Sequence, residues 1–429
     1  MESAWKKFVR IKKRSFSARA LILFAVVGSV VSPGLTLKYD DLPDLIQKKN
    51  GAVASSVGGI ESSRERTGHL YRSYLPHVDF MAGTEHFKTG PFPADMQPYG
   101  GVELSVNIFK GGNDLLEERA RTAQVGIAES QREKVLREEL SGARDYYWEL
   151  VFQREYLGVL KEIVELNQQG KKAANRRVSR GIVSKTDVMI FDLYSHQLDE
   201  QIESANHEID LIQLALRPRL GFSEADRIET PSIIPHDHDD TLIKSKPDIA
   251  SHPEVTGLLS QVAQREAQAS QSSRWWTPSV DVYANYSLYT LRERFYPATQ
   301  DRYDYALGVR LKMHLFDGFD SHQDAQSEHK AAASAEQMAA YRRRTLDTDI
   351  RLAQEEMTHI HELVHGAEKF IEQSGKLLKL SLGEYDRGVR TSSDILAMND
   401  RLLTLKKLYL ERRRDYQKTK VKLLSLLGK

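Results

Sequence analysis

An ordered series of internal matches constrains the fold of this chain more than any other sequence feature. Asn50-Gly51-Ala52-Val53 parallels His252-Pro253-Glu254-Val255 at an offset of 202 residues. Arg180-Gly181-Ile182 parallels Arg387-Gly388-Val389 at an offset of 207. Because these matches occur in the same order in both halves, they indicate two copies of one plan.

The two copies predict the organisation of the chain. Each is expected to hold a helix, one β-hairpin and two long helices that meet at a tight tip. The predicted segments are a signal peptide (1–34), a first copy (35–217, hairpin 76–109, tip 180–187), an irregular belt (218–252) and a second copy (253–429, hairpin 278–316, tip 387–394).

Each predicted hairpin contains strands in which apolar and polar residues alternate. The alternation is clearest over residues 101–108, 280–289 and 304–315, and weaker around Val78 and Phe80. Period-two patterning indicates strands with one apolar and one polar face, and lengths near ten residues suit tilted membrane strands. Four strands are too few for a membrane barrel, which needs about eight. An open sheet edge in lipid is prohibitively costly, so we expect several copies to share one barrel.

The remaining sequence is mostly helical. No proline occurs from Asn113 to about Ala174, and Leu140, Ala143, Tyr147 and Leu150 follow the spacing of a coiled-coil seam. A continuous helix of about 60 residues would be roughly 90 Å long. We expect a matching helix from Ser321 to about Glu384. The connecting loops, about 84–98 and 290–302, are rich in Pro, Thr and charge and are expected to face outward.

The amino-terminal segment resembles a secretory leader, with seven basic residues before a short apolar run from Ala20 to Val31. Without residues 1–34 the chain holds 54 Lys and Arg against 59 Asp and Glu, a net charge of −5. That balance argues against a nucleic-acid partner.

The chain has no cysteine, so we expect no disulfide, no thiolate metal site and no lipid anchor. No later apolar run is long enough for a transmembrane helix, so membrane insertion would require a closed barrel.

Taken in order, these motifs resemble the TolC family of outer-membrane efflux proteins. The residues that carry the resemblance are His252–Val255, the strand exit Leu315–Gly318 and the two RGxxxxxD turns ending at Asp187 and Asp394. The resemblance implies a 12-stranded barrel built by a homotrimer, four strands per protomer, continued into a coiled-coil α-barrel in the periplasm. It also implies a bacterial outer-membrane location in contact with lipid. The implied role is a passive, gated path for efflux or type I secretion, coupled to a periplasmic adaptor protein and an inner-membrane transporter.

The two tips have a structural interpretation that does not depend on the family. Glycine suits the left-handed conformation at a helix end, and Ser184 and Thr391 suit capping of the next helix. The resemblance implies that the tips also contact the adaptor, through Arg180, Gly181, Ser184, Arg387, Gly388 and Thr391. It further implies a periplasmic gate formed by Tyr385, Arg390, Asp187 and Asp394. The position of a second acidic ring in the family holds Ala397 here, which leaves a doubled ring open.

Two further motifs suggest other functions. His361-Glu362-Leu363-Val364-His365 satisfies HExxH, which on a helix can bind zinc, so a secreted zinc metallopeptidase is the main alternative. The third ligand is the difficulty, because Glu384 lies about 28 Å beyond His365 on a straight helix.

His236–Asp240 is a candidate for weak cation binding, although a solvated acidic loop is the more ordinary interpretation. A periplasmic coiled-coil scaffold without a barrel is a third possibility. We expect no catalytic residue, no resident metal, no cofactor and no enzymatic activity.

Overall fold

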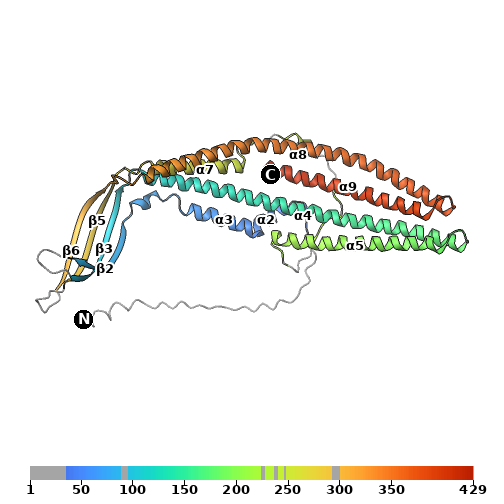
Figure 1. Ribbon diagram of the computed structural model, residues 1–429, viewed down its shortest axis with the longest axis horizontal. Coiled ribbons are helices and arrows are strands. Elements are labelled where there is room, and N and C mark those ends of the chain that lie inside the picture. Colours follow the sequence, from blue (N-terminus) through green and yellow to red (C-terminus); the bar gives the residue numbers. More distant parts are fainter. Residues whose placement is uncertain are drawn as a thin grey trace.

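The computed structural model describes residues 35–87, 95–223, 228–235, 240–245, 248–291 and 300–428. The described part is elongated, with a β-sheet at one end and two tight helical turns at the other (Figure 1). The elements are β1 (Leu35–Thr36), η1 (Tyr39–Asp41), α2 (Leu42–Lys49), α3 (Gly51–Arg64), η2 (Leu70–Tyr74), β2 (His77–Phe87), β3 (Asp95–Phe109), α4 (Asn113–Ser179), α5 (Lys185–Leu220), β4 (Ile228–Glu229), α6 (Asp240–Ile243), α7 (Pro253–Ser272), β5 (Ser279–Leu291), β6 (Gln300–Lys312), α8 (Asp320–Asp386) and α9 (Ser392–Leu426).

The main sheet joins the two predicted hairpins. Its order is β2-β3-β5-β6 and every neighbouring pair is antiparallel, so β2 and β6 are the edges. The strands are longer than the sequence predicted, because β2 continues to Phe87 and β3 begins at Asp95, inside the expected loop 84–98. Pro98 is compatible with this ladder because β3 pairs only with β2 there, and its pairing with β5 starts at Tyr99.

The register gives the sheet two chemically different faces. Val78, Leu104, Ala284 and Leu307 are successive partners across the four strands and therefore lie on one face. Residues one position along the strands lie on the other face, where Arg310 donates to Glu103 at 2.9 Å. The apolar face is uncovered, since Phe80 is 75% exposed, Leu307 78% and Tyr305 80%.

Two long helices connect the sheet to the distant turns. α4 and α8 have 67 residues each, which confirms the predicted long helices and extends both of them by several residues. The shorter helices pack beside these two long helices (Figure 1). α3 and then α5 lie along α4, and α7 and then α9 contact both α4 and α8. Among the described helices, none combines the length and the apolarity that a bilayer crossing requires.

Two residues that the internal matches pair with each other have the same structural role. The Asn50 side chain accepts from the amides of Ala52 and Val53 at 2.9 and 3.1 Å and so caps α3. His252 occupies the N-cap of α7 and accepts from the Glu254 amide at 3.3 Å. Each cap therefore sets the start of a helix that packs against α4.

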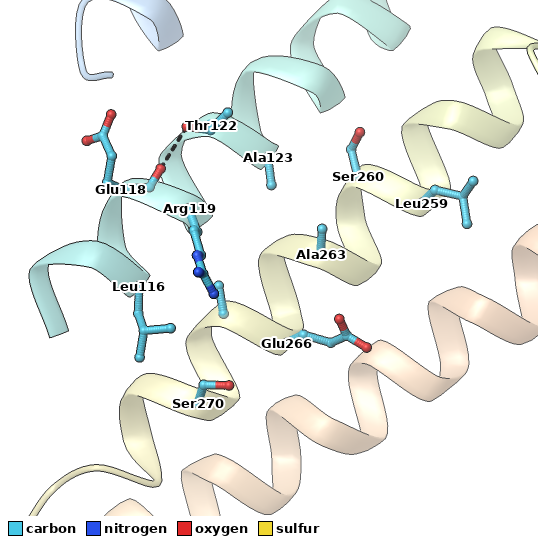
Figure 2. Close-up of a pocket in the computed structure, with 11 residues that line it drawn as sticks. Leu116, Glu118, Arg119, Thr122, Ala123, Leu259, Ser260, Ala263, Glu266 and Ser270 are labelled. Atoms are coloured by element: carbon cyan, nitrogen blue, oxygen red, sulfur yellow. Dashed lines mark hydrogen bonds between the residues drawn. The ribbon is translucent and has the colours of Figure 1, made fainter. Parts of the chain in front are cut away.

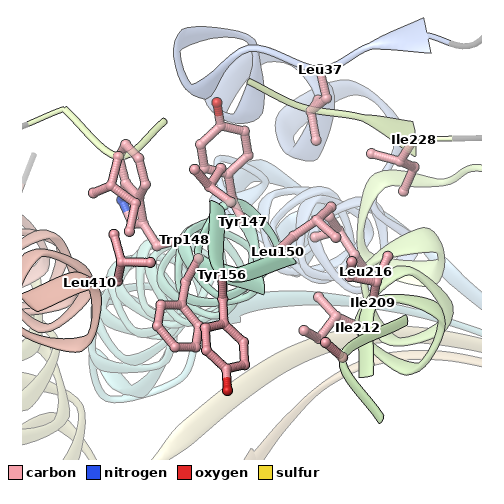
Figure 3. Packing of buried hydrophobic residues seen from close by; sticks show 14 of the residues in the cluster. Leu37, Tyr147, Trp148, Leu150, Tyr156, Ile209, Ile212, Leu216, Ile228 and Leu410 are labelled. Carbon is pink, nitrogen blue, oxygen red and sulfur yellow. The ribbon is translucent and has the colours of Figure 1, made fainter. Parts of the chain in front are cut away.

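The largest core lies midway along the helices, where the short elements cover α4. Figure 3 shows Leu150 of α4 pointing toward Leu216 of α5, and Trp148 of α4 beside Leu410 of α9. β1 pairs in parallel with β4, so part of the predicted irregular belt is ordered structure. Burial of each large apolar side chain here contributes about 1.5–3 kcal/mol, and this core holds the long helices in register.

Candidate functional site at the helix tips

The two turns at the far end have the same backbone geometry. Gly181 and Gly388 adopt φ values of 71° and 87°, which are strained for any other residue. In the first turn the amides of Gly181 and Ile182 donate to the carbonyls of Val178 and Arg177 at 2.9 and 3.0 Å. The second turn repeats both bonds, so each long helix ends in a Schellman motif and the chain reverses in a few residues.

The helices that follow the turns are capped differently. Thr391 and Asp394 form a capping box, in which the Asp394 amide donates to Thr391 Oγ1 at 3.3 Å and the Thr391 amide donates to Asp394 Oδ2 at 3.0 Å. These backbone and side-chain bonds from Thr391 hold the pKa of Asp394 below its usual value. Ser184 occupies the N-cap of α5 but its side chain makes no capping bond, so that part of the prediction was wrong.

The two caps also differ in the partner of the nearby carboxylate. Asp394 turns back to its own cap residue, whereas Asp187 Oδ1 accepts from Ser392 Oγ of the other helix pair at 3.0 Å. Asp187 therefore connects the start of α5 to the start of α9. The seam between the two helix pairs thus contains one of the predicted gate residues.

Tyr385 is the centre of this seam and is fully buried. The Phe191 ring of α5 packs edge-on against it with 6.0 Å between centroids. The Arg177 guanidinium of α4 lies 4.4 Å from the ring centroid, in a cation–π arrangement. Arg177 Nη1 also donates to the Arg390 carbonyl at 3.3 Å. Burial raises the pKa of the Tyr385 hydroxyl, with the Arg177 charge acting in the opposite direction, so the phenol stays neutral.

The ion-pair partner of Arg390 is not one of the other residues predicted for the gate. Its Nε donates to Glu384 Oε2 at 2.6 Å, and Glu384 belongs to the last turn of α8. This bond with Glu384 raises the pKa of Arg390 above its usual value. Within one chain the structure therefore brings Tyr385 and Asp187 to the seam and joins Arg390 to its own hairpin. The role of these residues in a gate stays a prediction.

Sequence reasoning missed several residues that hold the tip together. Arg176 Nη2 contacts Asp386 Oδ1 at 3.1 Å and adds an ion pair between α4 and α8. A Cβ on Gly170 would approach Phe191 to 2.6 Å, so glycine is required where Phe191 packs. Arg176 and Arg177 are consecutive arginines in the last turn of α4. From sequence, such residues suggest only a favourable interaction with the helix dipole, so their partners were not predicted.

The HExxH motif lies on a continuous stretch of α8. The helix passes through Gly366 and Gly375 to Asp386 without folding back, and the His361 and His365 rings lie 5.7 Å apart. His365 Nδ1 faces Glu368 at 3.5 Å. Across the described ranges, no group of three His, Cys, Asp or Glu side chains is placed to share a metal ion. The zinc-peptidase alternative is therefore not supported. Of the motif His236–Asp240, residues 236–239 lie outside the described residues.

The sequence of the chain also matches a known protein family. Residues 249–429 match the family described as outer membrane efflux protein. The match confirms the resemblance to TolC-type channels and the predicted outer-membrane localisation, and it identifies a family of transport proteins. The matched segment includes α8, α9 and the turn with Tyr385 and Arg390.

Solved structures extend the likeness to most of the chain. The outer membrane channel CmeC of Campylobacter jejuni superposes with a TM-score of 0.74 at 15% identity, covering 91% of this chain and 85% of that one. The outer membrane protein VceC of Vibrio cholerae gives 0.75 at 14% identity, with 91% and 96% covered. The open state of MtrE of Neisseria gonorrhoeae gives 0.69 at 12% identity, with 91% and 88% covered. At these identities the likeness shows a shared fold. A comparison of the sequence with curated proteins gives no match.

Proposed function

We propose that this chain is one protomer of a homotrimeric outer-membrane exit duct. In this proposal the sheet contributes four strands to a shared 12-stranded barrel, and the helices contribute to a tunnel that crosses the periplasm. An inner-membrane transporter supplies the energy and a periplasmic adaptor protein joins it to the helix tips. The duct itself is a passive path for efflux or type I secretion.

The proposal rests on the unpaired edges and the uncovered apolar face of the sheet. Among the described residues neither edge strand, β2 or β6, has a partner on its outer side, and the face with Phe80, Tyr305 and Leu307 is uncovered. Unpaired edges and a broad exposed apolar face are both unfavourable in water. Because β2 and β6 run antiparallel, β2 of one copy can pair with β6 of the next and closure removes every edge. The apolar face then contacts lipid.

The helical layer has matching open edges. α5 and α8 lie on opposite sides of the pair formed by α4 and α9. Exposed apolar residues occur on both outer helices, including Met189 and Leu193 of α5 and Phe370 and Leu380 of α8. Contact between α5 of one copy and α8 of the next would bury these side chains while β2 meets β6. The sheet and the helices thus favour the same arrangement of copies.

The tips supply the proposed contact with the adaptor. Ile182 and Val389 project from the two turns and are exposed, beside Arg180 and Arg387. Apolar side chains at the end of a solvated helical layer suit a partner that covers them. The gate proposal adds that Tyr385, Arg390, Asp187 and Asp394 close the tunnel at this level in the resting trimer.

Cysteine cross-linking tests the closure of the sheet without background, because the native chain has no cysteine. Asp79→Cys on β2 is combined in turn with Asp304→Cys, Ala306→Cys or Gly308→Cys on β6, all on the polar face. The control combines Asp79→Cys with Leu307→Cys, which lies on the opposite face. We expect one register to give a covalent trimer in outer-membrane fractions, and the control to give no cross-link.

The size of the cross-linked product decides the proposal. A ring of three ends at three chains, so products larger than a trimer contradict the stoichiometry. Chains that remain uncross-linked in every register contradict the pairing of β2 with β6. The same trimers should then conduct ions in a planar lipid bilayer.

A further inference from the structure

A polar groove lies where the sheet joins the helices. It has a volume of about 940 Å³ and is bounded by the end of α3, η2, α4 and α7. This size falls within the range of about 300–1,000 Å³ that is usual for small-molecule sites. Its charged lining residues are Arg66, Arg72, Lys110, Arg121, Glu65 and Glu117, so positive charge predominates.

Most of this positive charge is not neutralised by the described residues. Arg121 forms an ion pair with Glu117, four residues earlier on α4. Arg66, Arg72 and Lys110 make no ion pair with any residue in the part of the chain that the structure describes. Like charges that converge on one concave surface raise its potential and attract anions. The groove therefore offers unpaired cationic groups at a single place.

The opposite wall supplies neutral hydrogen-bonding groups. Gln264, Gln268 and Gln271 line it at positions i, i+4 and i+7 of α7, so they share one helix face. Gln264 already donates to Gln124 at 2.8 Å. Gln268 Oε1 and His69 Nδ1 are shielded from solvent and have no hydrogen-bond partner among the described residues. A polar ligand could satisfy both atoms, since the His69 nitrogen can donate in one tautomer and the Gln268 oxygen accepts.

The groove opens on the polar side of the sheet. His77 lines the groove and shares its sheet face with Asp79 and Glu103. A different cavity lies between other sides of α4 and α7, where Leu116, Arg119 and Ala263 face one another (Figure 2). If the apolar sheet face contacts lipid, the polar groove faces the lumen, and its occupant is a solute rather than a lipid.

We propose that this groove binds small multivalent anions that carry phosphate groups, as they pass through the duct. Phosphate oxygens accept strongly from Arg and Lys, and the glutamine amides add neutral donors around the same group. The inference rests on the proposed function for its exposure to the lumen. In a trimer the groove is repeated three times around the tunnel, just below the sheet.

Inorganic pyrophosphate is the probe, and its binding is measured by calorimetry on the purified protein at low ionic strength. We expect Arg72→Gln with Lys110→Gln to weaken binding at least about 10-fold, because two charge-assisted contacts are lost. Arg119→Gln is the control, since it also removes a positive charge but at a residue that lines the other cavity (Figure 2). The control should bind as the native protein does. Added salt should weaken native binding, since exposed charges are screened over about 10 Å at 0.1 M.

Trimer formation and conductance in KCl report on the duct separately from binding. Conducting trimers whose pyrophosphate affinity is the same in the native protein and the double variant would overturn the anion site and leave the duct intact. An equal loss of affinity in Arg119→Gln would also overturn it, because net charge rather than the groove would be responsible. Binding with the expected variant pattern, but without trimers or conductance, would keep the site and contradict the duct.

Discussion

An arginine placed at either of two adjacent positions in β6 should have opposite consequences. Leu307 lies near the middle of the strand on the uncovered apolar face, and Ala306 lies on the polar face with Asn285 and Glu103 as its row partners. An arginine that faces lipid at mid-bilayer costs about 2–4 kcal/mol, whereas lumen positions tolerate charge. With three copies the total for Leu307→Arg is about 6–12 kcal/mol per trimer.

The assay refolds urea-denatured chains into lipid vesicles and measures the fraction that becomes heat-modifiable trimer. The cost at one position corresponds to a change of about 30- to 1,000-fold in the folding equilibrium, so Leu307→Arg should give little trimer. Ala306→Arg should give nearly the native yield and change only the ion selectivity. Similar yields for the two variants, or a lower yield for Ala306→Arg, would refute the assignment of the faces.

Two further predictions concern the tips. Arg390→Ser and Glu384→Gln should each raise the closed-state conductance of single channels by about 1.5- to 5-fold, because each removes a partly exposed ion pair that holds the turn and is typically worth about 0.2–1 kcal/mol. Unchanged conductance in Arg390→Ser would exclude a role of this residue in closure. An increase in that variant alone would mean that Arg390 has another acidic partner. Because the folded-state pKa of Asp394 is lowered by its bonds with Thr391, its stabilising effect is present above the unfolded pKa of about 3.9 and is lost as pH falls through the lower folded value. Amide exchange in the first turn of α9 should accelerate over that acidic window, and an Asp394→Asn variant that shows the same pH dependence would contradict this.

Much of the architecture could be predicted from periodicity. The long helices followed from the absence of proline after Asn113, and the two sheet faces followed from alternation, because both patterns are local. The strand ends could not be predicted in the same way. Gly83 and Pro98 interrupt the alternation near the first loop, yet the ladder between β2 and β3 continues through both, because the partner strand supplies the hydrogen bonds.

The tip shows where prediction from sequence fails. The glycine turns followed from the conformation that only glycine adopts easily, and the structure confirms Gly181 and Gly388. The partner of Arg390 did not follow, because Glu384, Asp187 and Asp394 are all acidic residues within reach of a turn. Which one pairs depends on how α4, α8 and α9 cross, and that is set by packing around the buried Tyr385. A motif identifies the residues at such a site, and tertiary contacts determine which of them pair.

The pairing of β3 with β5 has a consequence for the order in which the protein is made. Residues 110–278 separate these strands, so the sheet cannot be completed while the chain is still emerging in its first half. Contacts between residues so distant in sequence form slowly. During that interval the first hairpin exposes both its apolar face and a strand edge, which are hazards for aggregation. For the proposed duct we therefore expect the exported chain to need protection until β6 has arrived, and membrane insertion to follow export.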